Sequence, residues 1–214
     1  MAQDLLKDVV YRRIRDLIIS GALPMGSKIS ETVLAERLSA TKAPVRDALK
    51  RLQSEGLVQI KPQSGTFVFS LCNDGFYDLL VFRYHIESKA MELALQKNAK
   101  TLIQEMSYVL DKMTTALSND SIPEYLSLDN QYHQVMVSSC GNTYFQESYD
   151  LISSRMATAR NHMGGNNEHM TRSFNQHIAI VDYLKNGKLE EAQDELKSHV
   201  LPQYGAYWDR VTHA

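Results

Sequence analysis

The stretch that decides the fold is residues 41–58, which reads TKAPVRDALKRLQSEGLV and is followed by GTFVF at residues 65–69. Its apolar residues recur at helical spacing, Thr41 is a suitable N-cap, and Pro44 is tolerated in the first turn of a helix. The composition then changes to β-branched and aromatic residues on both sides of a turn-rich segment. The pattern predicts an amphipathic helix followed by a β-hairpin.

Two more helices are predicted before this stretch. An apolar stripe over residues 5–18 has helical spacing and ends at Gly21. Ser30 is placed to cap a short helix that ends near Leu38. Three helices and a hairpin wing together make a winged helix-turn-helix, which we assign to residues 1–70.

The rest of the chain has a different pattern, with long helical stripes and no convincing strand. We expect about six helices there, with breaks at Gly141-Asn142, at the segment 164–167 and at Asn186-Gly187 among those that separate them. Short breaks between long helices favour an antiparallel all-α bundle, which we assign to residues 76–214. The predicted fold class is therefore mainly α, with a winged helix-turn-helix followed by a helical bundle.

Charge divides the chain at the same place. Residues 1–70 hold eleven Lys and Arg against seven Asp and Glu, a net charge of +4. Residues 71–214 hold twelve against eighteen, a net charge of −6, together with all seven histidines. A basic first part joined to an acidic second part is typical of a module that meets DNA phosphates attached to one that does not.

Composition indicates a soluble globular protein, since 43% of residues are hydrophobic and 22% are charged. The first ten residues carry Asp4, Lys7 and Asp8 and do not resemble a signal peptide, and no membrane span is expected because there is no run of about 20 apolar residues. Cys72 and Cys140 form no paired motif. We therefore expect a reducing, cytoplasmic location.

The helix that follows Thr41 and stops at Gly56 has the chemistry of a recognition helix. Lys42 and Arg46 lie one turn apart beside Thr41, and Lys50 follows one turn later, so these side chains can donate to guanine O6 and N7 or to phosphate. Gly65 would allow the wing to approach DNA closely. A basic helix face exposed only to solvent is the alternative for the lysines and the arginine taken alone.

Five segments resemble the GntR-family winged helix: ISE at 29–31, LAERL at 34–38, PVRDALKRL at 44–52, EGLV at 55–58 and GTFV at 65–68. The resemblance implies a homodimeric regulator that binds a palindromic operator and leaves it when an effector binds. Thr32 and Lys42 stand where the family often has Arg, whereas Arg46 matches its counterpart. Arg46 is therefore the strongest candidate for a base contact.

Asp129 and His133 are spaced i,i+4, so both side chains project from one helix face. An oxygen and an imidazole nitrogen on one face can bind a divalent metal, although an exposed helical pair is the commoner origin of this spacing. His177 and His199 lie on later helices beside apolar residues. Taken singly, each is more typical of a hydrogen-bonded core histidine.

Residues 76–212 resemble the FCD effector domain of FadR-type regulators, through RYHIE at 83–87, DNQYH at 129–133, GN at 141–142, Arg155, His177 and LKSH at 196–199. In metal-binding members an Asp and three His hold a divalent ion, and the matching residues here are Asp129, His133, His177 and His199. Zinc, nickel and manganese all fit this ligand set. Open positions on the ion would accept water or a small carboxylate.

The same resemblance places Arg83 near the effector, and Arg155 is a second candidate for binding an anion. An i,i+4 ion pair with Glu87 is an equally good account of Arg83.

The sequence thus predicts a repressor whose affinity for operator DNA is controlled by an organic acid bound at a metal-containing helical domain. Two alternatives stay open. A metal with an open position could activate water, as in a hydrolase-like enzyme. The ion could also be purely structural, or be the sensed signal itself.

Overall fold

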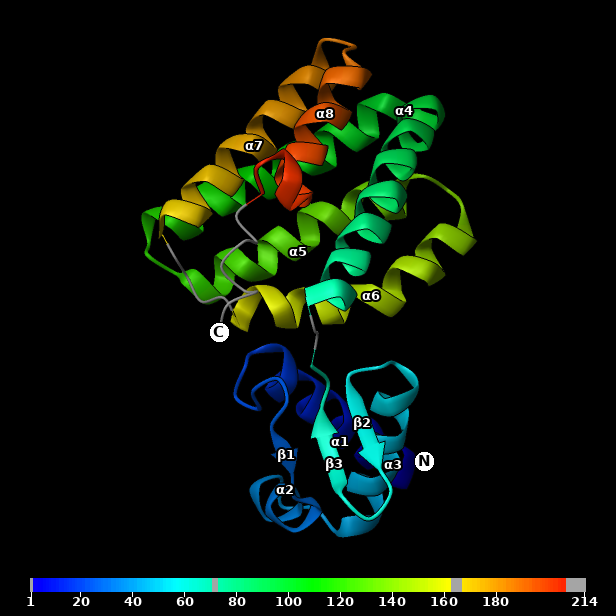
Figure 1. Ribbon diagram of the computed structural model, residues 1–214. Helices are drawn as coiled ribbons and strands as arrows, with labels where there is room; N and C mark the ends of the chain where they lie inside the picture. The colour runs from blue at the N-terminus through cyan, green and yellow to red at the C-terminus, as the bar shows by residue number, and fades with distance from the viewer. Residues whose placement is uncertain (1, 71–72, 163–166, 207–214) are drawn as a thin grey trace. The chain divides into compact units, whose positions relative to one another are not determined.

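The computed structural model describes residues 2–70, 73–162 and 167–206 (Figure 1). Contacts divide the chain into two units, the first made of residues up to Ser70 with Ser154–His162 and the second made of the remaining residues. The first unit contains α1 (Ala2–Ile19), β1 (Lys28–Ile29), α2 (Glu31–Arg37), α3 (Lys42–Ser54), β2 (Val58–Lys61) and β3 (Gly65–Val68). The other elements are α4 (Asn73–Ser118), α5 (Ile122–Ser139), α6 (Thr143–His162), α7 (Asn167–Lys185), α8 (Leu189–Val200) and a 3₁₀ turn, η1 (Pro202–Tyr204). The mainly α fold class is confirmed.

The winged helix is held together by apolar faces of α1 and α3. Val10, Ile14 and Ile18 of α1 are buried, as are Val45, Leu49 and Leu52 of α3, and the two helices pack against each other. Burying side chains of this size stabilises a fold by about 1.5–3 kcal/mol each. The opposite face of α3 is left to solvent.

The small sheet has one strand that the sequence pattern did not predict. β2 and β3 form the expected antiparallel hairpin, with Lys61 opposite Gly65. β1 pairs with the other edge of β3, giving the strand order β1-β3-β2. With only two residues, β1 has too little sequence to show a strand period, and it depends on β3 for its hydrogen bonds.

The turn between α2 and α3 contains a residue in an unfavourable backbone conformation. Ser30 caps α2 as expected, because its hydroxyl accepts a hydrogen bond from the Val33 amide at 3.4 Å. After α2, Ser39 has a φ of 51°, in the left-handed region that favours glycine. A side chain in that region costs about 1–2 kcal/mol. Glycine avoids this cost, but it also makes the unfolded chain more flexible, which cancels part of the gain in stability.

Ser39→Gly is therefore expected to raise the free energy of unfolding of the winged helix by about 0.5–1 kcal/mol. Thermal unfolding of the full chain, followed by circular dichroism, measures this effect. Glu36→Gly is the matched control, since Glu36 is exposed within α2 and glycine there is expected to cost about 1 kcal/mol. A Ser39→Gly protein no more stable than the wild type would contradict the prediction.

The described residues of the second unit form helices joined by short turns, and α4 is broken in its middle. Asn98 has φ −163° and ψ 84°, and its side-chain oxygen accepts a hydrogen bond from the Thr101 amide at 3.1 Å. Asn98 thus caps the second half of α4. With α4 counted as two helices, the described residues after Ser70 form six α-helices, close to the number expected, although the break at Asn98 was not among the predicted ones. α7 and α8 are packed side by side (Figure 1).

α4 also begins at Asn73, three residues before residue 76, where the second domain was expected to start. Cys140 is a free, buried thiol, and Cys72 lies outside the described residues. None of the described helices combines the length and the apolar character needed to cross a membrane.

Candidate metal centre and DNA-binding face

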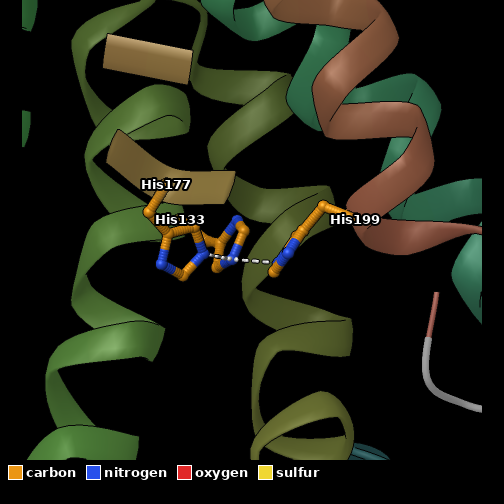
Figure 2. Close-up of side chains that lie close together, drawn as sticks. All are labelled: His133, His177 and His199. Carbon is orange, nitrogen blue, oxygen red and sulfur yellow. Dashed lines mark hydrogen bonds between the residues drawn. The ribbon is translucent and has the colours of Figure 1, made fainter. Parts of the chain in front are cut away.

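Three imidazole rings from three helices converge inside the helical unit (Figure 2). His133 comes from α5, His177 from α7 and His199 from α8, and all three are buried. The Nε2 atom of His133 lies 3.2 Å from Nε2 of His177 and 3.2 Å from Nε2 of His199. The point of convergence is therefore formed by three nitrogens of the same kind.

Asp129 adds an oxygen to this cluster. It lies one turn before His133 on α5 and is 2% exposed, and its Oδ1 atom is 3.7 Å from Nε2 of His177. The Ser173 hydroxyl donates to the same oxygen at 3.4 Å. The structure thus brings all four predicted ligand residues together, although they are spread over three helices.

The spacing of these atoms suits a divalent ion. Zinc–imidazole bonds are about 2.0–2.1 Å long, so two such nitrogens on one ion are about 2.9 Å apart in octahedral geometry and about 3.3 Å apart in tetrahedral geometry. The two Nε2–Nε2 distances of 3.2 Å lie between these values. Two of the three imidazole pairs are therefore spaced as ligands of a single ion would be.

The protons on two of the rings are fixed by their outer neighbours. Nδ1 of His133 donates to Oε2 of Glu87 at 2.9 Å, and Nδ1 of His199 donates to Oε1 of Gln176 at 3.2 Å. Each neutral ring then has an unprotonated Nε2. When both rings are neutral, the lone pairs on the two Nε2 atoms face each other at 3.2 Å, an arrangement that a cation between them stabilises.

Tyr132 contacts both the backbone and the ring of His177. Its hydroxyl donates to the backbone carbonyl of His177 at 2.9 Å, and the two ring centroids are 4.2 Å apart. Burial, reinforced by the charges of Asp129 and Glu87, raises the pKa of Tyr132 well above its ordinary value. The phenol therefore stays a neutral donor and supports the ligand helix without adding charge.

Arg83 makes the ion pair with Glu87 and also has donors left over. Its Nε donates to Glu87 Oε1 at 2.7 Å, and the whole side chain is buried. Burial alone would lower the pKa of Arg83, but the Glu87 charge, with Tyr149 and Asp129, raises it. Its Nη1 and Nη2 atoms have no hydrogen-bond partner among the described residues. A buried cation with two unused donors is suited to hold a carboxylate.

Arg155, the second effector-binding candidate, lies elsewhere. Arg155 is on α6 in the segment that groups with the first unit, so the structure does not place it with the four ligand residues. His85 and His162 are exposed, and His213 lies outside the described residues. Sequence reasoning gave no site role to Glu87, Tyr149 or Gln176, because their importance depends on contacts between helices.

The predicted DNA-contacting residues lie on the exposed surface of the first unit. Lys42 and Lys50 are exposed on α3, and Thr32 is exposed in the first turn of α2. Thr41 occupies the N-cap position of α3 but its hydroxyl makes no capping hydrogen bond, which leaves the hydroxyl available to a phosphate. Gly65 has a φ of 115°, and a Cβ there would lie 2.8 Å from Cε of Lys28. The hairpin therefore requires this glycine whether or not it meets DNA.

Arg46 is held in place by an acidic neighbour. Its Nε donates to Oε2 of Glu31 at 2.6 Å, while 61% of the Arg46 side chain is exposed. The two terminal nitrogens make no hydrogen bond within the described residues. Glu31 thus orients the guanidinium and leaves free the two donors that a guanine edge or a phosphate would use.

The class of protein follows from two features. The winged helix carries a basic, exposed recognition helix, and the helical unit contains a buried cluster of metal-ligand side chains. Together they are typical of a ligand-responsive DNA-binding regulator. Residues 6–68 match the model of the bacterial regulatory proteins of the gntR family, and residues 78–201 match the FCD domain. The chain belongs to the gntR family and carries an FCD effector-binding domain, as the sequence resemblance predicted.

Known relatives agree with this assignment. The chain is 24% identical over 186 residues to the gluconate operon transcriptional repressor of Bacillus subtilis, covering 82% of this chain and 74% of the relative. It is 28% identical over 188 residues to the Nta operon transcriptional regulator of Aminobacter aminovorans, covering 87% and 85%. The solved structure of E. coli McbR/YncC has the same fold, with a TM-score of 0.77 at 20% identity over 92% of this chain and 94% of that chain. The chain is a transcriptional regulator, and the enzyme alternative is set aside.

Proposed function

We propose that this regulator is a homodimeric repressor whose release from a palindromic operator is controlled by a small carboxylate bound at a divalent ion in the helical unit. The observation that carries the proposal is the convergence of three buried Nε2 atoms at 3.2 Å spacings beside the Asp129 carboxylate. Glu87 and Gln176 each offer an acceptor to Nδ1 of His133 and His199, which favours a neutral ring with Nε2 unprotonated, the state that metal ligands need. A regulator that binds the chromosome in this way acts in the cytoplasm.

Asp129, His133, His177 and His199 would hold the ion. Three imidazole nitrogens and one carboxylate oxygen suit zinc, nickel or manganese, and a six-coordinate ion would keep positions for water or for a ligand oxygen. Bound there, the ion would act as a Lewis acid toward an anionic oxygen.

Charge balance favours a carboxylate as the effector. Asp129 and Glu87 are acidic and Arg83 is basic, so the buried centre has a single negative charge without an ion and a single positive charge with a divalent one. Uncompensated charge is costly in a buried site, and one carboxylate neutralises it. Nη1 and Nη2 of Arg83 offer donors to that carboxylate. One relative is named for the gluconate operon, and gluconate belongs to this chemical class.

Control of DNA binding follows from linkage. An effector changes operator affinity only by the difference between its affinities for the DNA-bound and DNA-free arrangements of the dimer. A coupling of 1–3 kcal/mol is common in such systems and corresponds to about a 5–150-fold change in affinity.

The test is operator binding of the full-length, metal-loaded protein to a DNA fragment that it selects from a random pool. Fluorescence anisotropy is followed while small carboxylates are added one at a time. Arg83→Lys keeps the positive charge beside Glu87 but removes the two unused donors. We expect this variant to bind operator normally and to need about 10–100-fold more of the active carboxylate, since charge-assisted hydrogen bonds contribute about 1.5–3 kcal/mol.

Lys89→Met is the control, because Lys89 is an exposed residue of the same helix that pairs with Glu92. It should respond to the carboxylate as the wild type does. If no carboxylate changes operator affinity, the proposed effector class is wrong. If chelation lowers the melting temperature while operator affinity stays constant in every condition, the ion is structural.

A further inference from the structure

Glu87 lies at the meeting point of three helices and accepts hydrogen bonds from each of them. Its Oε1 accepts from Arg83 Nε on α4 at 2.7 Å and from the Tyr149 hydroxyl on α6 at 2.6 Å. Its Oε2 accepts from His133 Nδ1 on α5 at 2.9 Å. The side chain is 0% exposed, so no water competes for these bonds.

A carboxylate is the group that this position requires. The three donors need an acceptor with two oxygens and several lone pairs, which a carboxylate has and an amide lacks. The Arg83 charge offsets the cost of burying the carboxylate charge. Removing either partner of such a buried pair leaves the other uncompensated, so the pair and its donors act as a unit.

The geometry points to Glu87 as the positioning residue of the metal centre, which orients the His133 ring toward the ion through Nδ1 while Arg83 and Tyr149 hold its carboxylate in place. This inference rests on the proposed metal function. It adds to the proposed site a residue that is not itself a ligand of the ion. By accepting a hydrogen bond from Nδ1–H, Glu87 keeps the proton of a neutral His133 ring on Nδ1, which leaves Nε2 unprotonated and increases its basicity. Tyr149 makes α6 part of the support of a site whose four ligands come from α5, α7 and α8.

The experiment measures ion affinity and geometry in the full-length protein, with Zn²⁺ titrated against a chromophoric chelator and Co²⁺ followed by visible absorption. Glu87→Gln keeps the shape of the side chain and removes its charge. We expect Zn²⁺ affinity to fall about 10–100-fold, the usual consequence of losing the outer partner of a metal-bound histidine. The Co²⁺ bands should also shift, because they report the geometry of the ligands around the ion. If Glu87 only stabilised the fold, the ligand geometry and the bands would stay unchanged.

Glu92→Gln is the matched control on the same helix, where Glu92 pairs with the exposed Lys89. It should bind Zn²⁺ within about twofold of the wild type, the range expected for a surface ion pair. Tyr149→Phe, with the exposed Tyr144→Phe as its control, removes one donor without burying a charge. It should show a smaller loss of affinity and a smaller shift of the Co²⁺ bands.

The outcomes separate the two proposals. If the wild type binds Zn²⁺ and Glu87→Gln binds it equally well with the same Co²⁺ spectrum, the role of Glu87 is refuted and the metal centre stands. If the wild type binds neither ion, both are refuted. If Glu87→Gln does not fold, Tyr149→Phe decides: a shifted spectrum supports the positioning role, and an unchanged one overturns it.

Discussion

Protein purified without chelators is expected to carry about one divalent ion per chain, and a His133→Ala/His177→Ala variant is expected to carry none. Structural zinc sites with four ligands bind with about 10–16 kcal/mol at neutral pH, so losing two ligands removes several kcal/mol. Every 1.4 kcal/mol is tenfold in affinity, which makes the expected loss about a thousandfold or more. Elemental analysis of dialysed protein by mass spectrometry measures the ion content.

The control for this experiment is a His85→Ala/His162→Ala variant, because both histidines are exposed. It should keep the ion content of the wild type. Equal ion content in the two double variants would mean that the ion is bound elsewhere, and the centre formed by α5, α7 and α8 would have to be abandoned as the metal site.

The second large effect is expected at the recognition helix, where Arg46→Ala should weaken binding to the selected operator by about 5–150-fold. The estimate corresponds to the 1–3 kcal/mol of a bidentate contact to a base. Arg46→Lys should restore little of this loss, since an ammonium cannot make the two parallel hydrogen bonds of a guanidinium. Glu31→Gln, which removes the charge that orients Arg46, should give an intermediate loss.

Lys50→Ala distinguishes specific from general contacts. If Lys50 meets only phosphate, its loss weakens binding to selected and unrelated DNA alike and lowers the slope of log affinity against log salt by about one. Arg46→Ala should instead reduce the preference for the selected sequence. An Arg46→Ala protein that keeps the full preference would show that another residue reads the bases.

Much of the fold was predictable because the patterns are local. The helix at 42–54 could be recognised from its own apolar period, and the hairpin from its composition and turn. The break at Asn98 was missed because it involves neither Gly nor Pro, and the asparagine stabilises it by capping the next helix. β1 was missed because two residues carry no period.

In the candidate site, too, features within one helix were predictable and contacts between helices were not. The i,i+4 spacing of Asp129 and His133 placed both on one face of α5. The spacing of residues could not predict that His177 and His199, which lie on other helices, meet them in space. That prediction came from the family resemblance. The pairing of Arg83 with Glu87 was foreseeable as a helical ion pair. That Glu87 also accepts from His133 depends on how α4 packs against α5.

The distribution of the four ligand residues over three helices has a consequence for the stability of the FCD domain. His133 is 44 residues from His177 and 66 residues from His199, so one ion would tie together three helices that are distant in the chain. A covalent bridge across loops of this length stabilises a protein by about 3–5 kcal/mol, largely by restricting the unfolded chain. Disulfides do not persist in a reducing compartment, whereas coordination does. The bundle would thus be cross-linked by a bond that forms and dissolves with the supply of the ion, and its resistance to unfolding would follow that supply.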